Sequence, residues 1–249
     1  MKKRVLLVAL GMILLLGIGS LLLYNGVFWL NNPSKAAYPV RGVDVSAYQG
    51  TIDWPTLRAQ DLDFAFIKAT EGSSHRDPFF LVNWVEARKA GLRAGAYHFF
   101  SFESSGTTQA ENFLAALSEA EAQSDENWPA ALPPVVDMEL YGEFQKNPPP
   151  AETVRRELNR LLQAIEEHCG VWPILYATQR AREEYLGTEY TQYDLWIRSV
   201  YLAPQTDDWT FWQYSHKGKL SGYSGPEHFI DLNVFSGSQE AFAAYGLPE

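Results

Sequence analysis

Sulfur and concentrated positive charge are scarce in this sequence. Among its 249 residues there is one cysteine, Cys169, so no intramolecular disulfide can form. The five histidines are dispersed and show no spacing typical of a zinc site. Lys and Arg form no basic tract beyond residues 2–4, and the net charge of −10 disfavours binding to nucleic acid or to anionic lipid. A disulfide scaffold, a structural zinc ion and a nucleic-acid partner are therefore not expected.

Charge is also missing from the N-terminal stretch Val5 to Leu23, 19 residues that follow three basic residues. At about 1.5 Å per residue this run nearly spans the roughly 30 Å hydrocarbon layer of a membrane. A cleaved signal peptide has an apolar region of only about 7–15 residues. We therefore expect residues 1–30 to be an uncleaved transmembrane anchor, with a removed signal as the alternative, and residues 31–39 to be a polar tether. The basic residues place the rest of the chain outside the inner membrane.

From Pro39 onward, short apolar runs alternate with longer amphipathic segments. The apolar runs predict eight strands, over residues 40–48, 63–70, 93–100, 133–138, 172–178, 193–200, 209–215 and 228–235. Helical spacing predicts helices over residues 54–60, 78–90, 107–123, 151–169 and 180–186. This alternation indicates one α/β domain, residues 40–249, folded as a single irregular (β/α)8-type barrel. An open doubly wound sheet is the alternative, although no G-x-G-x-x-G or P-loop motif follows any strand.

The segment LPPVVDMELY, residues 132–141, contains the most informative pair of acidic residues. Two prolines cannot continue a helix, so the Val-Val pair that follows them reads as a buried strand. Residues i and i+2 of a strand face the same side, which brings Asp137 and Glu139 together. Neighbouring carboxylates repel each other, and this raises one of the two pKa values and leaves the other group ionised. A helix cap or a surface ion pair is the structural alternative.

Other carboxylates lie where predicted strands end. Asp44 lies near the end of the first strand, Glu71 just past the second and Asp231 at the end of the last. In (β/α) barrels the functional site is built at the C-terminal ends of the strands. Together with the pair at residues 137 and 139, these side chains predict a cluster of carboxylates at one rim of the barrel. Acidic residues also occur before strands, so the pattern is suggestive and not decisive.

Eight segments resemble those of glycoside hydrolase family 25, the lysozymes or N-acetylmuramidases that cleave bacterial peptidoglycan. They occur in the family's order between about residues 40 and 235: GVDVSAYQGTIDW, FAFIKATEG, GAYHFF, PVVDMEL, WPILYAT, LWIRSVY, WQYS and DLNVF. The resemblance implies an irregular (β/α) barrel, muramidase activity, and no metal or other cofactor. This sequence differs from the family at Tyr48, where the family often has Trp, and at Arg198-Ser199, in a stretch that is commonly Ala-rich.

Carried over to this sequence, the resemblance marks Asp44, Asp137, Glu139 and Asp231 as the acidic cluster. We expect Glu139 to be the general acid for the β-1,4 bond between N-acetylmuramic acid and N-acetylglucosamine. Asp137 is expected to stay ionised and to orient the substrate acetamido group, which would then act as the nucleophile with retention of the anomer. A non-catalytic peptidoglycan-binding barrel and another acetamido-sugar glycosidase are the alternatives.

Substrate binding is assigned to six residues. Two are acids, Asp44 and Asp231, expected to hold sugar hydroxyls or to tune the catalytic pair. Four others are expected to stack on sugars or to donate an amide hydrogen bond, although buried aromatic residues are more often core: Tyr97, Tyr176, Trp212 and Gln213. The expected partners are glycan strands and, through the N-terminal helix, the inner membrane. We expect a monomer.

Overall fold

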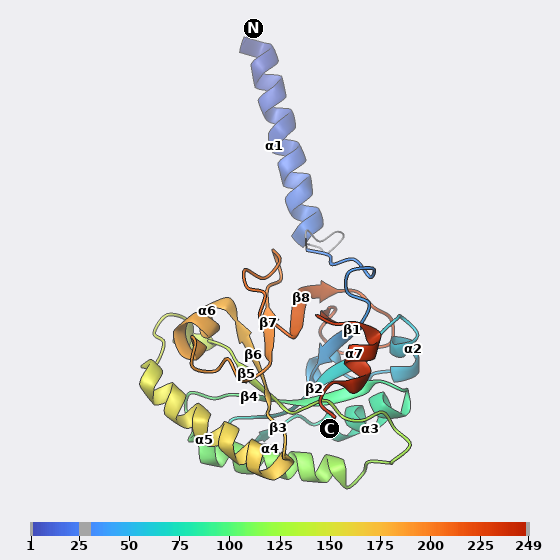
Figure 1. Cartoon of the computed structure of the whole chain (residues 1–249). Coiled ribbons are helices and arrows are strands. Elements are labelled where there is room, and N and C mark those ends of the chain that lie inside the picture. Colours follow the sequence, from blue (N-terminus) through green and yellow to red (C-terminus); the bar gives the residue numbers. More distant parts are fainter. Residues whose placement is uncertain (1, 25–30, 248–249) are drawn as a thin grey trace.

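The computed structural model describes residues 2–24 and 31–247 (Figure 1). The helix α1, Lys2–Tyr24, projects away from a barrel that contains the remaining elements. Residues 3–22 are apolar and long enough to cross a membrane, and none of the span is buried against the protein. Length and composition thus agree with either a membrane anchor or a signal sequence.

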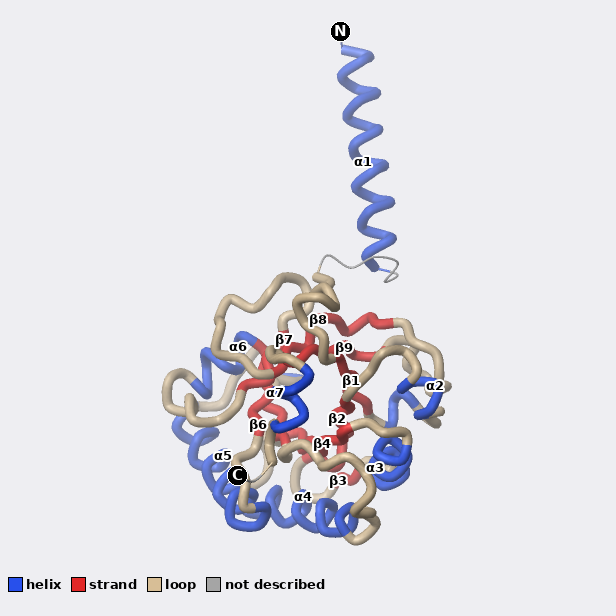
Figure 2. Tube along the Cα trace, turned by 45° about the vertical axis from the view of Figure 1, so that its right-hand side comes forward, coloured by secondary structure: helices blue, strands red, loops and turns tan. Residues whose placement is uncertain are grey.

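Eight strands close into a barrel (Figure 2), so the predicted fold is confirmed. Neighbouring strands are parallel except at the last one, which runs antiparallel to both of its neighbours. The pairing of the first two barrel strands completes the ring. A two-residue strand, β3 (His75–Arg76), pairs with β2 outside the ring. The barrel strands are β1 (Arg41–Val45), β2 (Phe64–Glu71), β4 (Arg93–Phe99), β5 (Val135–Met138), β6 (Ile174–Thr178), β7 (Leu195–Arg198), β8 (Phe211–Gly218) and β9 (Ile230–Phe235).

The direction of β9 corrects one expectation about the rim of the barrel. Asp231 was expected at the end of the last strand, but it is the second residue of β9. Because β9 is antiparallel, its beginning lies at the rim where the parallel strands end, and Asp231 is directly opposite Asp44 of β1. Asp231 therefore lies at the predicted rim, but at the beginning of its strand and not at the end.

Helices cover the barrel where strands are joined by crossovers. The five predicted helical segments are all helical, although the predicted helix over residues 180–186 consists of α6 and a π-helical turn, residues 182–186. In α5 the buried residues recur every three or four positions, and Gly170 ends the helix in a left-handed conformation, φ 67°. The helices are α2 (Trp54–Arg58), α3 (Phe80–Lys89), α4 (Gly106–Glu121), α5 (Ala151–Cys169), α6 (Gln179–Ala181) and α7 (Gln239–Ala244).

The interior of the barrel is filled by aromatic side chains. Phe66 stacks on Trp196 with ring centroids 4.3 Å apart, and Phe64 packs edge-on against Phe66. The helix α7, which the sequence did not predict, closes one end, because its Phe242 packs on Phe64 at 5.5 Å. Gly42 leaves room for this filling, since a Cβ there would lie 2.4 Å from the Phe64 ring. One end of the barrel is thus packed shut, and a cleft can open only at the other.

The segment predicted as a tether lies against the barrel. The outer face of β7 to β9 is covered by residues 31–40, and Asn31 and Pro33 are buried there. The Asn31 amide donates hydrogen bonds to three backbone carbonyls, at 2.7 Å to Ser199, 3.0 Å to Leu202 and 3.3 Å to Tyr214. These hydrogen bonds attach the start of residues 31–39 to β8 and to the loop that follows β7.

The close approach of α4 to α5 gives a stability prediction. A Cβ at Gly106 would lie 1.8 Å from the backbone oxygen of Glu157, so backbone atoms must move to accept it. We expect Gly106→Ala to lower the free energy of unfolding by about 3 kcal/mol, measured by urea denaturation of the full chain in detergent. Thr107→Ala, at an exposed position one residue further on, is the control and should stay near wild type. Equal stability of the two variants would show that the helices separate freely.

Candidate active site

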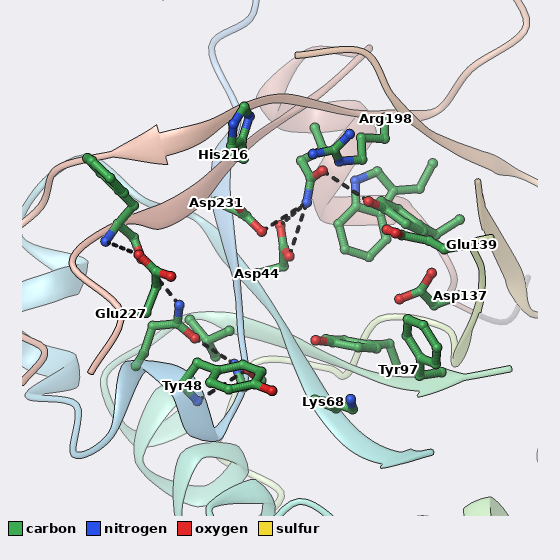
Figure 3. A pocket seen from close by; sticks show the side chains of 18 residues that line it. Asp44, Tyr48, Lys68, Tyr97, Asp137, Glu139, Arg198, His216, Glu227 and Asp231 are labelled. Carbon is green, nitrogen blue, oxygen red and sulfur yellow. Dashed lines mark hydrogen bonds between the residues drawn. The ribbon is translucent and has the colours of Figure 1, made fainter. Parts of the chain in front are cut away.

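A cleft of about 380 Å³ opens at the rim of the barrel where the parallel strands end (Figure 3). Its lining includes acids from three strands that are far apart in the sequence, together with tyrosines and a glutamine. Seven of the eight residues predicted for the site line it: Asp44, Tyr97, Asp137, Glu139, Tyr176, Gln213 and Asp231. Most of the residues predicted for the site thus line one cleft.

The pair at the end of β5 has the predicted arrangement. Asp137 and Glu139 both line the cleft, while Met138 between them points outward and is fully buried in the helix-facing core. Figure 3 shows the two carboxyl groups on the same side of the cleft. Glu139 is half-buried and lies just beyond the last residue of β5. The alternation of side chains in a strand produces this geometry directly.

The surroundings of Asp137 act against its ionised form. Only 7% of Asp137 is exposed, and within the described residues its Oδ1 has no hydrogen-bond partner. Burial, and then the nearby charge of Glu139, raise the pKa of Asp137 well above its usual value. Burial therefore acts against the ionised form that the sequence led us to expect, because residue spacing does not reveal the depth of burial. A hydrogen bond from a substrate N–H would favour the ionised form.

Asp44 and Asp231 form a second carboxyl pair. The Gln213 amide donates to both carboxylate oxygens of Asp44, at 3.0 and 3.1 Å, and to Asp231 at 3.3 Å. Asn233 adds a bond of 2.7 Å to Asp44. Burial raises the pKa of both acids; the two amides oppose this at Asp44, and Asp231 also donates a hydrogen bond to Asp44. We infer that Asp231 holds a proton and Asp44 carries the charge.

The predicted aromatic and amide residues have different surroundings. Tyr176 donates a hydrogen bond to Gln213 at 3.0 Å, so Gln213 links a tyrosine to the second acid pair. Tyr97 also lines the cleft, and burial raises the pKa of both phenols well above the usual range, so both stay protonated. Their hydroxyl groups can therefore donate hydrogen bonds.

Trp212 does not line the cleft. It precedes Gln213 on β8, so strand alternation turns its ring to the outer face of the barrel. There its indole N–H donates to the Ser199 carbonyl at 2.9 Å, and its ring packs against Tyr38 and Trp209. The prediction that Trp212 stacks on substrate is wrong, since its face is covered by the segment over β7 to β9.

Several residues of the site were not assigned a role from the sequence. Asn233 is fully buried beside the cleft and holds Asp44, and its position two residues after Asp231 on the same strand was the available signal. Arg198 follows inward-facing Trp196 by two residues, so the same alternation could have found it. Trp196 itself also lines the cleft. The remaining ones come from segments near the rim and gave no pattern: Val45, Ser46, Tyr48, Gln49, Lys68, Phe99, His216, Glu227 and Phe229.

His98 has a structural environment rather than a substrate contact. It is fully buried, with Nε2 3.1 Å from the Gln109 Oε1 and Nδ1 2.7 Å from the Thr70 hydroxyl. The amide oxygen can only accept, so Nε2 carries the hydrogen and Nδ1 accepts from the hydroxyl. Burial lowers the pKa of His98 to about 4, which keeps it neutral. In the described ranges, 2–24 and 31–247, no group of three or more His, Cys, Asp or Glu side chains could hold a metal ion.

Comparison with known families identifies the family of this barrel. The family described as glycosyl hydrolases family 25 matches residues 43–223. The chain belongs to this family. This family 25 protein is therefore a glycoside hydrolase, and the resemblance stated from sequence segments is confirmed.

Relatives of this family 25 hydrolase share most of its barrel. The structure of a family 25 glycosyl hydrolase from Bacillus anthracis is 48% identical, with a TM-score of 0.77 over 87% of this chain and 97% of that one. A bacterial lysozyme from Streptomyces coelicolor is 29% identical, with a TM-score of 0.68 over 82% of this chain and 95% of that one. Lysozyme M1 of Streptomyces globisporus is 32% identical over 215 residues, which are 80% of this chain and 68% of the relative.

Proposed function

We propose that this hydrolase is a muramidase that cleaves the β-1,4 bond between N-acetylmuramic acid and N-acetylglucosamine in peptidoglycan. The observation that carries the proposal is the pair of carboxyl groups of Asp137 and Glu139 on one side of an open cleft. Glycoside cleavage requires a proton donor beside a group that stabilises positive charge at the reacting carbon. Relatives named lysozyme and N,O-diacetylmuramidase support the choice of this sugar linkage.

In the proposed mechanism Glu139 donates a proton to the oxygen that leaves the anomeric carbon. Asp137 accepts a hydrogen bond from the N–H of the 2-acetamido group and holds its carbonyl oxygen below that carbon. The carbonyl oxygen attacks as the glycosidic bond breaks, and a cyclic oxazolinium forms. Glu139, now ionised, removes a proton from water, which opens the ring with net retention.

The second acid pair supports this chemistry from the floor of the cleft. Asp44 lies among two amide donors and the Asp231 carboxyl, which fixes its position. We propose that Asp44 and Asp231 bind sugar hydroxyls and that the charge of Asp44 stabilises the positive charge developing on the sugar ring. Tyr97 and Tyr176 provide hydroxyl groups and ring faces along the same wall.

We propose that α1 is a membrane anchor and that the barrel acts outside the inner membrane. The support is the apolar span of residues 3–22, preceded by basic residues, with a mean hydropathy of 2.8. Cleavage as a signal sequence would leave the same barrel in the same compartment. The proposed partners are glycan strands and the bilayer, and the proposed form is a monomer.

The products of digestion test the proposed linkage. We expect muropeptides released from purified sacculi by the full chain to carry N-acetylmuramic acid at the reducing end, seen by mass spectrometry after borohydride reduction. This reducing end forms only when the bond between the anomeric carbon of N-acetylmuramic acid and the glycosidic oxygen is hydrolysed. Fragments that end in reduced glucosamine would instead identify a glucosaminidase, and an absence of fragments would favour a non-catalytic binding barrel.

A further inference from the structure

A second hollow, of about 320 Å³, adjoins the cleft, and Arg198 lines both. The hollow lies between the end of β6 with the start of α6 on one side and the loop that follows β7 on the other. Its lining includes Thr178, Arg180, Arg198 and Ser199. A sugar bound in the cleft could therefore extend a substituent past Arg198 into this space.

The hollow is positively charged in a protein whose net charge is −10. Its lining contains Arg180 and Arg198 and no acidic residue. Arg180 is exposed and donates one hydrogen bond, of 2.6 Å, to the backbone oxygen of Gln145. Within the described ranges no carboxylate forms an ion pair with either arginine. The charges of Glu139, Asp231 and Asp44 act on Arg198 from the cleft side, but none of them forms a direct ion pair with it in the described residues, so both guanidinium groups can still bind an anionic ligand.

The direction of Arg198 follows from its place in the barrel. On β7 the side chains of Trp196 and Arg198 face inward and Ile197 faces outward. Arg198 pairs with Thr178 of β6 and with Gln213 of β8, so it stands at the boundary between the hollow and the acid-lined cleft. Figure 3 shows its guanidinium on the same wall of the cleft as Glu139. The charge of Arg198 is therefore positioned beside the proposed reaction site.

We propose that this hollow binds the side chain that N-acetylmuramic acid carries on its C3 oxygen, and that Arg198 and Arg180 recognise a carboxylate on that side chain. The inference rests on the proposed muramidase function. The lactyl group on this oxygen ends either in a free carboxylate or in a peptide that contains a D-glutamyl residue, and N-acetylglucosamine has only a hydroxyl there. A planar guanidinium matches a carboxylate with two parallel hydrogen bonds. The hollow would therefore distinguish N-acetylmuramic acid from N-acetylglucosamine. It would also bind an acidic peptide more tightly than a neutral one.

Three glycan oligomers separate the sources of the carboxylate. One bears peptides with D-isoglutamate, the second bears the neutral D-isoglutamine form, and the third has no peptide and a free lactyl carboxylate. Binding is measured by calorimetry with the full-length Glu139→Gln variant in detergent, so that the oligomers are not cleaved. Cleavage is measured with the full-length wild-type chain. We expect the acidic peptide to bind about tenfold more tightly than the amidated one, a difference of about 1.4 kcal/mol.

Two variants and one control test the role of the hollow. Arg198→Gln and Arg180→Gln should each bring the affinity ratio of acidic to amidated peptide toward one. Arg156→Gln, an exposed arginine on α5, removes the same charge elsewhere and should preserve the ratio. Because a ratio compares two ligands on one protein, a general effect of Arg198 on the nearby acids cancels. Tight binding of the peptide-free oligomer that depends on Arg198 would assign the carboxylate to the lactyl group and also support the hollow.

Equal affinity for the acidic, the amidated and the peptide-free oligomers would overturn the inference, and so would a preference that survives both substitutions. Failure of the proposed function looks different. In that case the active chain cleaves none of the three oligomers, while the affinity ratios still report whether the hollow reads a carboxylate. The binding measurement therefore judges the hollow whether or not cleavage occurs.

Discussion

Replacing Glu139 by Gln is expected to lower kcat for the hydrolysis of purified sacculi by at least about 10³-fold, because the leaving oxygen loses its proton donor. Gln has nearly the same shape as Glu, so substrate affinity and the folded structure should be retained. The measurement is the release of reducing ends at saturating substrate, combined with sedimentation binding to sacculi. The position of Glu139, half-buried at the rim just after β5, is what assigns it this role.

Glu143→Gln provides a matched control for this variant. Glu143 is an exposed acid in the 3₁₀ turn Gly142–Gln145, four residues further along the chain and outside the cleft. Its replacement should leave kcat within about twofold of wild type. If Glu139→Gln lyses sacculi at the wild-type rate, another group donates the proton and the assignment of the cleft must change.

Asp137→Asn is expected to reduce kcat by about 10² to 10³-fold and, at the same time, to raise the melting temperature at pH 7. The activity falls because Asn cannot supply the charge that orients and stabilises the acetamido group. The stability rises because Asn removes a carboxyl whose ionised form is penalised by burial beside Glu139. Opposite changes in activity and stability are expected where a site is strained for function.

The pH dependence of this stability difference follows from the raised pKa of Asp137. Between the ordinary value of 3.8 and the raised value, the folded protein holds a proton that the unfolded chain has lost. Stability of the wild type therefore falls as the pH rises through that window. Thermal unfolding of both proteins from pH 3.5 to 7.5 should show the advantage of Asp137→Asn growing with pH. Asp207→Asn, at an exposed position, is the control; a constant offset at all pH values would contradict the buried-acid explanation.

The stereochemistry of the first product tests the role assigned to Asp137. Attack by the acetamido oxygen followed by water inverts the anomeric carbon twice, so the wild type should release the β anomer. Time-resolved NMR of a short oligomer detects the anomer before mutarotation. An α anomer as the first product would show direct attack by water and would remove the acetamido group from the mechanism.

Local sequence patterns predicted the barrel and the acidic residues of its cleft that come from strands. The period of two in VVDMEL places Asp137 and Glu139 on one face whatever the rest of the fold does, which is why that pair was found. The same rule places Trp212 and Gln213 on opposite faces of β8, so only one of these two neighbours can line the cleft. Arg198 was noticed only as a departure from family composition, although it follows Trp196 at the same spacing.

Other features depend on contacts that local patterns do not encode. The direction of β9 is set by its pairing with β1 and β8, so the sequence could not show that Asp231 begins its strand. The protonation of Asp137 depends on burial by several strands at once. The docking of Asn31 depends on carbonyls about 170 residues away, at Ser199 and Leu202.

The docking of Asn31 also limits the distance between the barrel and the end of α1. Because the barrel begins at that residue, only the seven backbone steps from Tyr24 to Asn31 separate it from the end of α1, a distance of at most about 25 Å when fully extended. If α1 is the proposed anchor, this short connection restricts the enzyme to glycan strands that lie close to the membrane surface.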